Sequence, residues 1–254
     1  MTLQWWKSLL FSVLIYLGMP VLGLFFLPWA LVRRDGAVAA CHAWCDWVIW
    51  LCHNLIGLRT EVRGTPPTDE VLVAAKHQSF LDIILIYNAI PRGKFIMKKE
   101  LTWAPILGWF ALRIGCVPVD RGKRAQAVKL MVAEVEAGRA DPGQLVIYPQ
   151  GTRVAPAARV PYKIGSGALY EALGQDCVPV ACNVGVFWPR RGVLRKPGLA
   201  VVEFLPRIPA GLPVIEFMDR LSVAVEYESD RLMAEAGFPV QPHEGPLVSR
   251  GRKA

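Results

Sequence analysis

The sequence predicts an α/β domain, with a mixed and mostly buried sheet flanked by helices, preceded by a membrane-associated pair of helices. After Arg59, short runs typical of strands alternate with longer helical runs. Hydrophobic residues make up 53% of the 254 residues and charged residues 20%, against about 45–50% and about 25% in soluble domains. We expect a two-helix segment over residues 1–58, an α/β domain over 59–236 and a flexible basic tail over 237–254.

The first segment contains the longest uncharged run of the chain. None of the 25 residues from Ser8 to Val32 is charged, and about 20 residues suffice for a helix to cross a bilayer. Pro20 and Pro28 interrupt this run, and proline bends a helix because it lacks the N–H group and clashes with the preceding turn. The run therefore predicts a membrane-associated helix that is kinked or inserted at a shallow angle.

A second, less apolar stretch runs from Ala37 to Leu58. On a helix, His42, Asp46 and His53 form one polar stripe, and we expect them to contact each other or the following domain. The small residues from Ala37 to Ala39 favour an alternative, a cleaved signal peptide, but the uncharged run is longer than the usual 7–15 residues or so. A helical hairpin held in the membrane is the preferred interpretation.

The α/β domain is predicted from apolar runs and helical periodicity. The helix near the C-terminus carries many charges and is expected to pack on the outside, and the segment from Gly237 is expected to be flexible. The predicted strands are Val71–Ala75, Lys94–Met97, Leu145–Tyr148, Val178–Ala181 and Leu199–Leu205, and the predicted helices begin at Asp82 or cover Arg124–Ala137 and Phe217–Ala236.

Positive charge is concentrated in the middle of the chain. Residues 76–163 hold fourteen Lys and Arg against six Asp and Glu, while both flanks are neutral, so this segment carries the whole net charge of +8. Such a surplus favours anionic ligands such as phosphates or anionic lipids. We do not expect nucleic acid as a partner, because the sequence contains no zinc-finger spacing, no RNP-like motif and no basic heptad region.

The six cysteines indicate a reducing environment. Three of them lie within one apolar stretch, which is a poor disulfide framework for a chain of this length. Cys41, His42, Cys45 and His53 lack a second ligand pair that would complete a metal site. We therefore expect no metal ion.

The first candidate site follows the first predicted strand. Ser79 and Asp82 have the spacing of a helix capping box, which places His77 just before the helix and Asp82 in its first turn. A carboxylate that orients an imidazole produces a general base, because it fixes the tautomer and stabilises the imidazolium. A purely structural role of Asp82 at the start of the helix is the alternative.

Two arginines follow the ends of other predicted strands. Arg121 ends the segment that begins at Gly115, and Arg153 follows the strand that ends at Tyr148. Because open α/β sheets bind ligands at the strand ends, the two guanidinium groups are expected to meet near His77 and to hold a phosphate. A basic loop from Trp188 to Lys196, which includes Arg195, is expected either to touch lipid headgroups or to be solvated.

Four segments in this order resemble the glycerolipid acyltransferase family. The first is His77 to Asp82, a His, four residues and an Asp. The second is Gly115 to Arg121, the third is Tyr148 to Arg153, and the fourth is the apolar strand around Pro179. The resemblance covers roughly residues 60–210, and it implies a fold like that of the glycerol-3-phosphate acyltransferases.

Three positions depart from the family pattern. Lys76 stands where the family often has Asn, Pro118 interrupts an apolar position, and Gln150 replaces a Glu. An amide can still orient the turn or donate a hydrogen bond to a phosphate, so we expect Gln150→Glu to be tolerated. The change also leaves room for an acceptor other than lysophosphatidic acid, such as lyso-ornithine lipid.

The resemblance implies a 1-acylglycerol-3-phosphate O-acyltransferase of phospholipid biosynthesis. Acyl-CoA or acyl-carrier protein is the implied co-substrate, a lysophospholipid the acceptor and phosphatidic acid the product, with membrane lipids as partners and no other cofactor. The implied location is the cell inner membrane, with the active site on the cytoplasmic side. His77 and Asp82 are the implied catalytic residues, and the implied substrate-binding residues are Lys99, Arg121, Gln150, Gly151, Thr152, Arg153 and Lys163.

Other classes fit the sequence less well. A serine hydrolase requires a G-x-S-x-G elbow, and Gly165, Ser166 and Gly167 have the wrong spacing. A phosphate-loop NTPase requires Ser or Thr after the lysine, but Arg124 follows Lys123. The remaining rival is a membrane-tethered protein that binds anionic lipid without catalysis.

Overall fold

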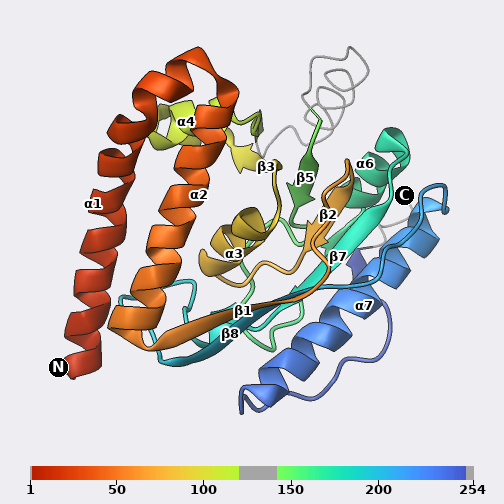
Figure 1. The fold of residues 1–254 in the computed structure, drawn as a ribbon. Coiled ribbons are helices and arrows are strands. Elements are labelled where there is room, and N and C mark those ends of the chain that lie inside the picture. Colours follow the sequence, from red (N-terminus) through yellow and green to blue (C-terminus); the bar gives the residue numbers. More distant parts are fainter. Residues whose placement is uncertain (1, 120–141, 250–254) are drawn as a thin grey trace.

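A single seven-stranded sheet forms the centre of the molecule (Figure 1). The computed structural model describes residues 2–119 and 142–249. In these ranges the strands follow the order β1-β8-β7-β2-β5-β3-β4. The five strands from β7 to β4 are parallel to one another, and β8 joins them antiparallel to β7 while β1 runs parallel to β8. The sheet is therefore mixed, as predicted.

The elements of the described ranges follow one another in an α/β pattern after two N-terminal helices. The helices are α1 (Leu3–Val32), α2 (Arg34–Leu51), a π-helical turn (Cys52–Ile56), α3 (Leu81–Ala89), a 3-10 turn (Lys99–Trp103), α4 (Leu107–Arg113), α6 (Gly165–Leu173), a second 3-10 turn (Val184–Val186) and α7 (Val214–Glu235). The strands are β1 (Leu58–Gly64), β2 (Leu72–Ala75), β3 (Gly93–Lys98), β4 (Val117–Val119), β5 (Gln144–Ile147), β6 (Tyr162–Lys163), β7 (Cys177–Cys182), β8 (Gly198–Phe204) and β9 (Val248–Ser249).

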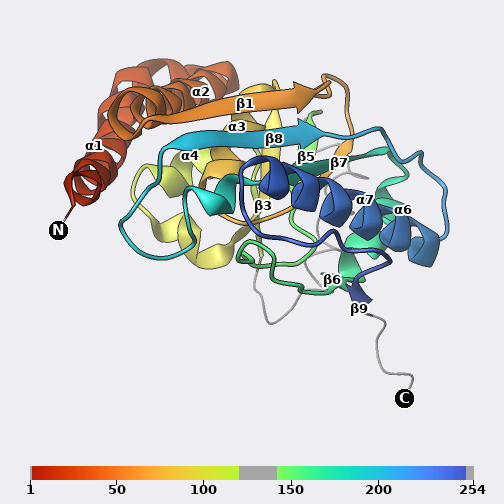
Figure 2. The same cartoon turned by 90° about the horizontal axis from the view of Figure 1, so that it is seen from below.

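Helices cover both faces of the sheet (Figure 2). One hydrophobic core joins α1, α2 and α3 to one face, and a second joins α6 and α7 to the other. Alternate residues of β2 enter different cores: Val73 and Ala75 belong to the first, and Leu72 and Ala74 to the second. Because β2 is buried on both faces, it appears in the sequence as a continuous apolar run.

The N-terminal helices form a hairpin that packs on the domain. They are joined at Arg33, and the inner face of the hairpin contributes Phe11, Ile15 and Val48 to the same core as α3. The helix α1 contains both Pro20 and Pro28 and is nevertheless one continuous helix. The domain supports its C-terminal end, because the guanidinium group of Arg113 donates hydrogen bonds to the carbonyl oxygens of Ala30 and Leu31.

The outer face of α1 is apolar and exposed. Its exposed side chains recur every three or four residues, which is the spacing of one helical face. Within the described ranges, α1 is the one helix long and apolar enough to cross a membrane by length and composition, and its 30 residues give a length of about 45 Å. We take it as membrane-associated. The stripe comprises Leu3, Trp6, Leu10, Val13, Leu17, Val21 and Leu24.

The polar stripe of the second helix contacts the following domain. His42 Nδ1 lies 3.4 Å from the Asn88 Oδ1 atom of α3, and the Asn88 amide donates a 3.0 Å hydrogen bond to Asp46. His53 is exposed. Two of the three stripe residues therefore meet the domain through one asparagine, which is one of the two arrangements that the sequence predicts.

Three further predictions concern α7, the segment from Gly237 and the helix expected over Arg124–Ala137. The helix α7 matches the predicted helix, but it packs along the sheet and buries Glu226 and Asp230. In the segment from Gly237, for which the sequence predicts flexibility, the backbone N–H groups of His243 and Leu247 donate to Asp230 and Ser222, and β9 pairs with β6. The predicted helix Arg124–Ala137 lies outside the described residues.

Close packing at the hairpin turn generates a stability prediction. A Cβ atom on Gly36 would lie 2.6 Å from the backbone of both Trp29 and Ala30, so Gly36→Ala forces the two helices apart. Although alanine favours a helix, overpacking costs about 1–3 kcal/mol. We expect a lower Tm in detergent for this variant.

The control for this prediction is Gly165→Ala, because no atom lies within 4 Å of a Cβ atom built on Gly165. Its Tm should equal or exceed that of the wild type. A Gly36→Ala protein as stable as the wild type would show that the hairpin turn has room to spare.

Candidate active site

His77 and Asp82 form a hydrogen-bonded pair at the end of β2. The Nδ1 atom of His77 lies 2.8 Å from Oδ1 of Asp82. Side chains alternate beyond the end of the strand, so His77 faces α3 and Lys76 faces the opposite side. Asp82 is fully buried, whereas His77 keeps 13% of its side chain exposed.

The other oxygen of Asp82 holds the backbone before α3. Its Oδ2 atom accepts hydrogen bonds from the N–H groups of Gln78 (2.9 Å) and Ser79 (2.7 Å). A negative charge in the first helical turn is also stabilised by the helix dipole. Since a carboxylate can only accept, it fixes the proton of His77 on Nδ1 and leaves Nε2 as a proton acceptor.

The capping arrangement differs in detail from the predicted box. The Ser79 hydroxyl accepts a hydrogen bond from the N–H group of Leu81 at 3.2 Å, and α3 begins at Leu81. The acidic half of the box is present, in the bond from the Ser79 N–H group to Asp82. The spacing of Ser79 and Asp82 therefore predicted the bond that fixes the Asp82 carboxylate, whose other oxygen binds His77.

An aromatic ring supports the imidazole from the neighbouring strand. Tyr148 follows β5 and stacks on His77, with 4.0 Å between the ring centroids and 23° between their planes. Burial and the nearby Asp82 raise the pKa of Tyr148 well above its usual range. The uncharged phenol ring thus packs against the His77 imidazole and restricts its rotation.

The segment after β5 turns back beside His77. Gly151 adopts a φ of +67°, which favours glycine, and the N–H group of Val154 donates a 2.7 Å hydrogen bond to the His77 carbonyl oxygen. The Lys163 ammonium lies over this turn, since a Cβ atom on Gly151 would be 2.6 Å from Lys163 Nζ. The first and third sequence blocks are therefore in direct contact.

A cavity of about 640 Å³ opens beside His77. Its wall near His77 carries basic residues, including Arg153, Lys163 and Arg190. Much of the remaining wall is apolar and comes from the hairpin, α3, β3 and the start of α4, with Lys98 of β3 as a further cation. The apolar wall includes Met19, Leu22, Trp44, Ile84, Ile96, Ile106, Leu107 and Phe110. A molecule with an anionic group and an apolar chain matches this division.

The structure unites most of the predicted site residues. Asp82 lies directly behind His77, and His77 shares the cavity wall with four other predicted residues. Lys98, not the predicted Lys99, contributes to the wall, because Lys99 begins the next turn. Arg121 lies outside the described residues. The four further predicted residues in the wall are Gly151, Thr152, Arg153 and Lys163.

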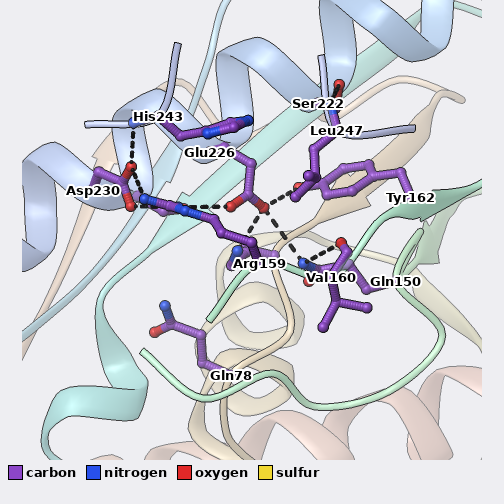
Figure 3. A network of polar contacts seen from close by, with 12 residues as sticks. Gln78, Gln150, Arg159, Val160, Tyr162, Ser222, Glu226, Asp230, His243 and Leu247 are labelled. Carbon is purple, nitrogen blue, oxygen red and sulfur yellow. Dashed lines mark hydrogen bonds and ion pairs between the residues drawn. The ribbon is translucent and has the colours of Figure 1, made fainter. Parts of the chain in front are cut away.

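Gln150 is placed behind the cavity rather than in its wall. It is 1% exposed, and its Nε2 atom donates to the Glu226 carboxylate at 3.4 Å and to the Val160 carbonyl oxygen at 3.3 Å (Figure 3). The amide therefore contacts α7 and the following loop. This geometry therefore does not support the predicted direct contact between Gln150 and the substrate.

Two arginines of the basic loop before β8 have different roles. Arg190 lines the cavity and donates a hydrogen bond to the Arg153 carbonyl oxygen at 3.2 Å. Arg195 is 9% exposed, lies 4.6 Å over the Trp188 ring and donates to carbonyl oxygens of its own loop. The backbone N–H group of Arg195 also donates a hydrogen bond to the Ser8 hydroxyl at 2.9 Å. Arg195 therefore anchors α1, and we correct its expected role in headgroup contact.

Sequence reasoning missed the acidic residues of α7. Glu226 and Asp230 are buried and pair with Lys76 and Arg159. The apolar residues Phe217, Met218, Leu221 and Val225 have helical spacing, and continuing this spacing leads through Glu226 and Asp230. That periodicity was the available signal. Across the described ranges, no group of three or more His, Cys, Asp or Glu side chains has an arrangement that could hold a metal ion.

Comparison with known proteins identifies similar sequences. Residues 59–183 match the family model described as Acyltransferase. The chain is 27% identical over 213 residues to the 1-acyl-sn-glycerol-3-phosphate acyltransferase of Pseudomonas aeruginosa, covering 82% of this chain and 83% of that protein. It is 33% identical over 137 residues to the lyso-ornithine lipid O-acyltransferase of Rhodobacter capsulatus, covering 52% of this chain and 49% of that protein.

The fold is also similar to a solved structure. The crystal structure of the 1-acyl-sn-glycerophosphate acyltransferase PlsC from Thermotoga maritima matches with a TM-score of 0.76 and 18% identity, over 91% of this chain and 97% of that chain. At this identity the match shows the fold. Together the matches confirm the predicted α/β architecture and the resemblance to the glycerolipid acyltransferases.

Proposed function

We propose that this chain, which belongs to the acyltransferase family through residues 59–183, transfers a fatty acyl group to the sn-2 hydroxyl of 1-acylglycerol-3-phosphate. The donor is the thioester of acyl-CoA or acyl-carrier protein, and the product is phosphatidic acid for phospholipid biosynthesis. The observation that carries the proposal is His77, backed by Asp82, in the wall of a cavity lined by both basic and apolar residues. The name of the Pseudomonas relative supports the choice of acceptor.

His77 is the general base of the proposed reaction. Its Nε2 atom takes the proton from the acceptor hydroxyl while that oxygen attacks the thioester carbonyl, and Asp82 stabilises the imidazolium that forms. The tetrahedral intermediate then expels the thiolate, which takes the proton from His77. Acyl transfer is direct, and no acyl-enzyme forms.

The developing oxyanion needs hydrogen-bond donors that do not already donate to another protein group. The N–H groups of Gln78 and Ser79 donate to Asp82, and that of Gly151 donates to the Tyr148 carbonyl oxygen. The helix start is therefore a poor oxyanion hole. We assign the oxyanion to the backbone N–H groups of Thr152 and Arg153 in the same turn.

The basic wall is assigned to the phosphate of the acceptor. Arg153, Lys163 and Arg190 line the cavity on the side of His77, and a guanidinium group holds a phosphate with paired hydrogen bonds. Arg121 remains a proposed second arm of this clamp on sequence alone. The apolar end is assigned to the acyl chain, which would lie against the hairpin.

The hairpin keeps the site at a membrane surface in this proposal. The exposed apolar stripe of α1 would enter the lipid, so that the cavity opens where both acyl chains reside. The preferred location is the cytoplasmic side of the inner membrane. An acceptor such as lyso-ornithine lipid is the second candidate, favoured by Gln150 and by the Rhodobacter relative.

The first test is acyl transfer by His77→Ala. Removal of a general base lowers the rate about 10²–10⁴-fold, so labelled acyl-CoA and lysophosphatidic acid should give little product. The matched control is His53→Ala, because His53 is exposed and lies outside the cavity wall.

Each outcome of this test separates the candidates. Wild type that prefers another lysolipid would keep the base and reassign the acceptor. Wild type that binds lipid without turnover would instead support a non-catalytic lipid-binding protein.

The phosphate assignment predicts a change in one KM value. Arg153→Ala should raise the KM for lysophosphatidic acid about tenfold or more, because a charge-assisted hydrogen bond contributes about 1.5–3 kcal/mol, and should leave the KM for acyl-CoA within about twofold. The exposed Arg220 of α7 provides the control, Arg220→Ala. Equal changes for both substrates would assign Arg153 to the donor or to the fold.

The apolar assignment predicts a change in chain-length preference. A Cβ atom on Gly23 would lie 2.7 Å from Ile106 Cγ2, and both residues line the cavity. Gly23→Val should therefore shift the ratio of kcat/KM for palmitoyl-CoA over decanoyl-CoA downward by about tenfold, since misfit of small groups in apolar pockets costs about 1–3 kcal/mol. The control is Val21→Leu on the exposed face. An unchanged ratio would place the acyl chain elsewhere.

A further inference from the structure

The carboxylate of Glu226 is the centre of a buried polar network behind the candidate site (Figure 3). It is fully buried and lies 2.5 Å from the Lys76 ammonium. Three other side chains also donate to it: Tyr162 at 3.0 Å, Arg159 at 3.2 Å and Gln150 at 3.4 Å. One α7 side chain therefore accepts hydrogen bonds from four side chains, which lie at position 76, at position 150 and in the stretch 159–162.

Two of these donors directly precede site residues in the chain. Lys76 is followed by His77, and Gln150 is followed by Gly151 and the turn that carries Arg153. The same two positions depart from the acyltransferase sequence pattern. Both departures thus meet at a single buried oxygen, Oε1 of Glu226.

The charges of the network balance only with an amide at position 150. Lys76 and Arg159 supply two positive charges, and Glu226 and Asp230 supply two negative ones. Gln150 Nε2 faces two acceptors, the Glu226 carboxylate and the Val160 carbonyl oxygen. A carboxylate at position 150 would have no proton to donate and would add an unpaired negative charge in a buried place.

We propose that Lys76, Gln150 and Glu226 are positioning residues, which hold His77 and the Gly151–Arg153 turn at a fixed separation through one shared carboxylate. This inference rests on the proposed function. It revises the expectation from sequence that Gln150→Glu is tolerated. Glu226 of α7 already supplies the carboxylate next to position 150, so a second carboxylate there would lie against it. It also explains why a lysine can stand beside the catalytic histidine without entering the cavity.

The test is a double-mutant cycle on Gln150 and Glu226 in the full-length protein. Gln150→Glu brings two carboxylates together, and Glu226→Gln leaves Lys76 without its counter-charge. We expect each to lower kcat about tenfold or more, with the KM for acyl-CoA changed less than about threefold. The combined variant Q150E/E226Q restores one carboxylate and one amide between the same partners, and its kcat should return to within about threefold of wild type.

A control variant on the same helix distinguishes a positioning role of the network from a purely structural one. Asp230→Asn removes the neighbouring buried carboxylate, which pairs with Arg159 but touches neither Lys76 nor Gln150 in the described contacts. It should lower the Tm and leave kcat within about twofold of wild type. A loss of kcat in Asp230→Asn equal to that of the single variants would overturn the inference.

A further variant, Gln150→Met, covers the case in which a charged variant fails to fold. Gln150→Met removes the donor without adding charge, and it should still lower kcat at least about threefold at a temperature well below its Tm. Full kcat in that variant, or a double variant no more active than the worse single one, would overturn the positioning role. Wild type without any turnover would instead overturn the proposed function, and this inference with it.

Discussion

The orientation of the whole candidate site depends on the carboxylate of Asp82. One of its oxygens binds the imidazole of His77, and the other binds two consecutive backbone N–H groups before α3. A buried carboxylate without these donors would carry a large desolvation penalty. The need to satisfy it therefore fixes the backbone between β2 and α3. The His77 carbonyl oxygen of that backbone in turn accepts a hydrogen bond from the N–H group of Val154, the residue that follows the third block.

The parts of the fold that the sequence predicts are those with local signals. Strands β2, β5 and β7 are buried apolar runs, and His77 and Asp82 lie five residues apart, so one turn unites them. Strand β1 was missed because Arg59, Glu61 and Arg63 leave it without the continuous apolar run that marks the buried strands. It lies at a sheet edge, where charge is tolerated. Pro20 and Pro28 lie inside α1, and the helix assignment continues through both of them to Val32.

The contacts that the sequence could not predict join distant segments. Glu226 lies 150 residues after Lys76 and 76 after Gln150, and no local spacing predicts that these side chains meet. Arg190 looked like one of several basic loop residues, and only the fold shows that it lines the cavity while Arg195 does not. The residues of a family pattern thus indicate the proposed reacting groups, whereas the supporting charges depend on tertiary packing.

The shared core of the hairpin and the sheet has a consequence for biosynthesis. Phe11 packs edge-on against Trp188, and Gln4 donates to the Arg195 carbonyl oxygen 191 residues away. A ribosome releases the hairpin first, long before those partners exist, and domains fold from the N-terminus as they emerge. Until the segment that contains Trp188 and Arg195 is synthesised, Gln4 and Phe11 lack these native partners. Under the proposed membrane attachment, the lipid that receives α1 would shield this end of the nascent hairpin from aggregation. Under that proposal, delivery of α1 to the membrane would precede the docking of the hairpin on the α/β domain.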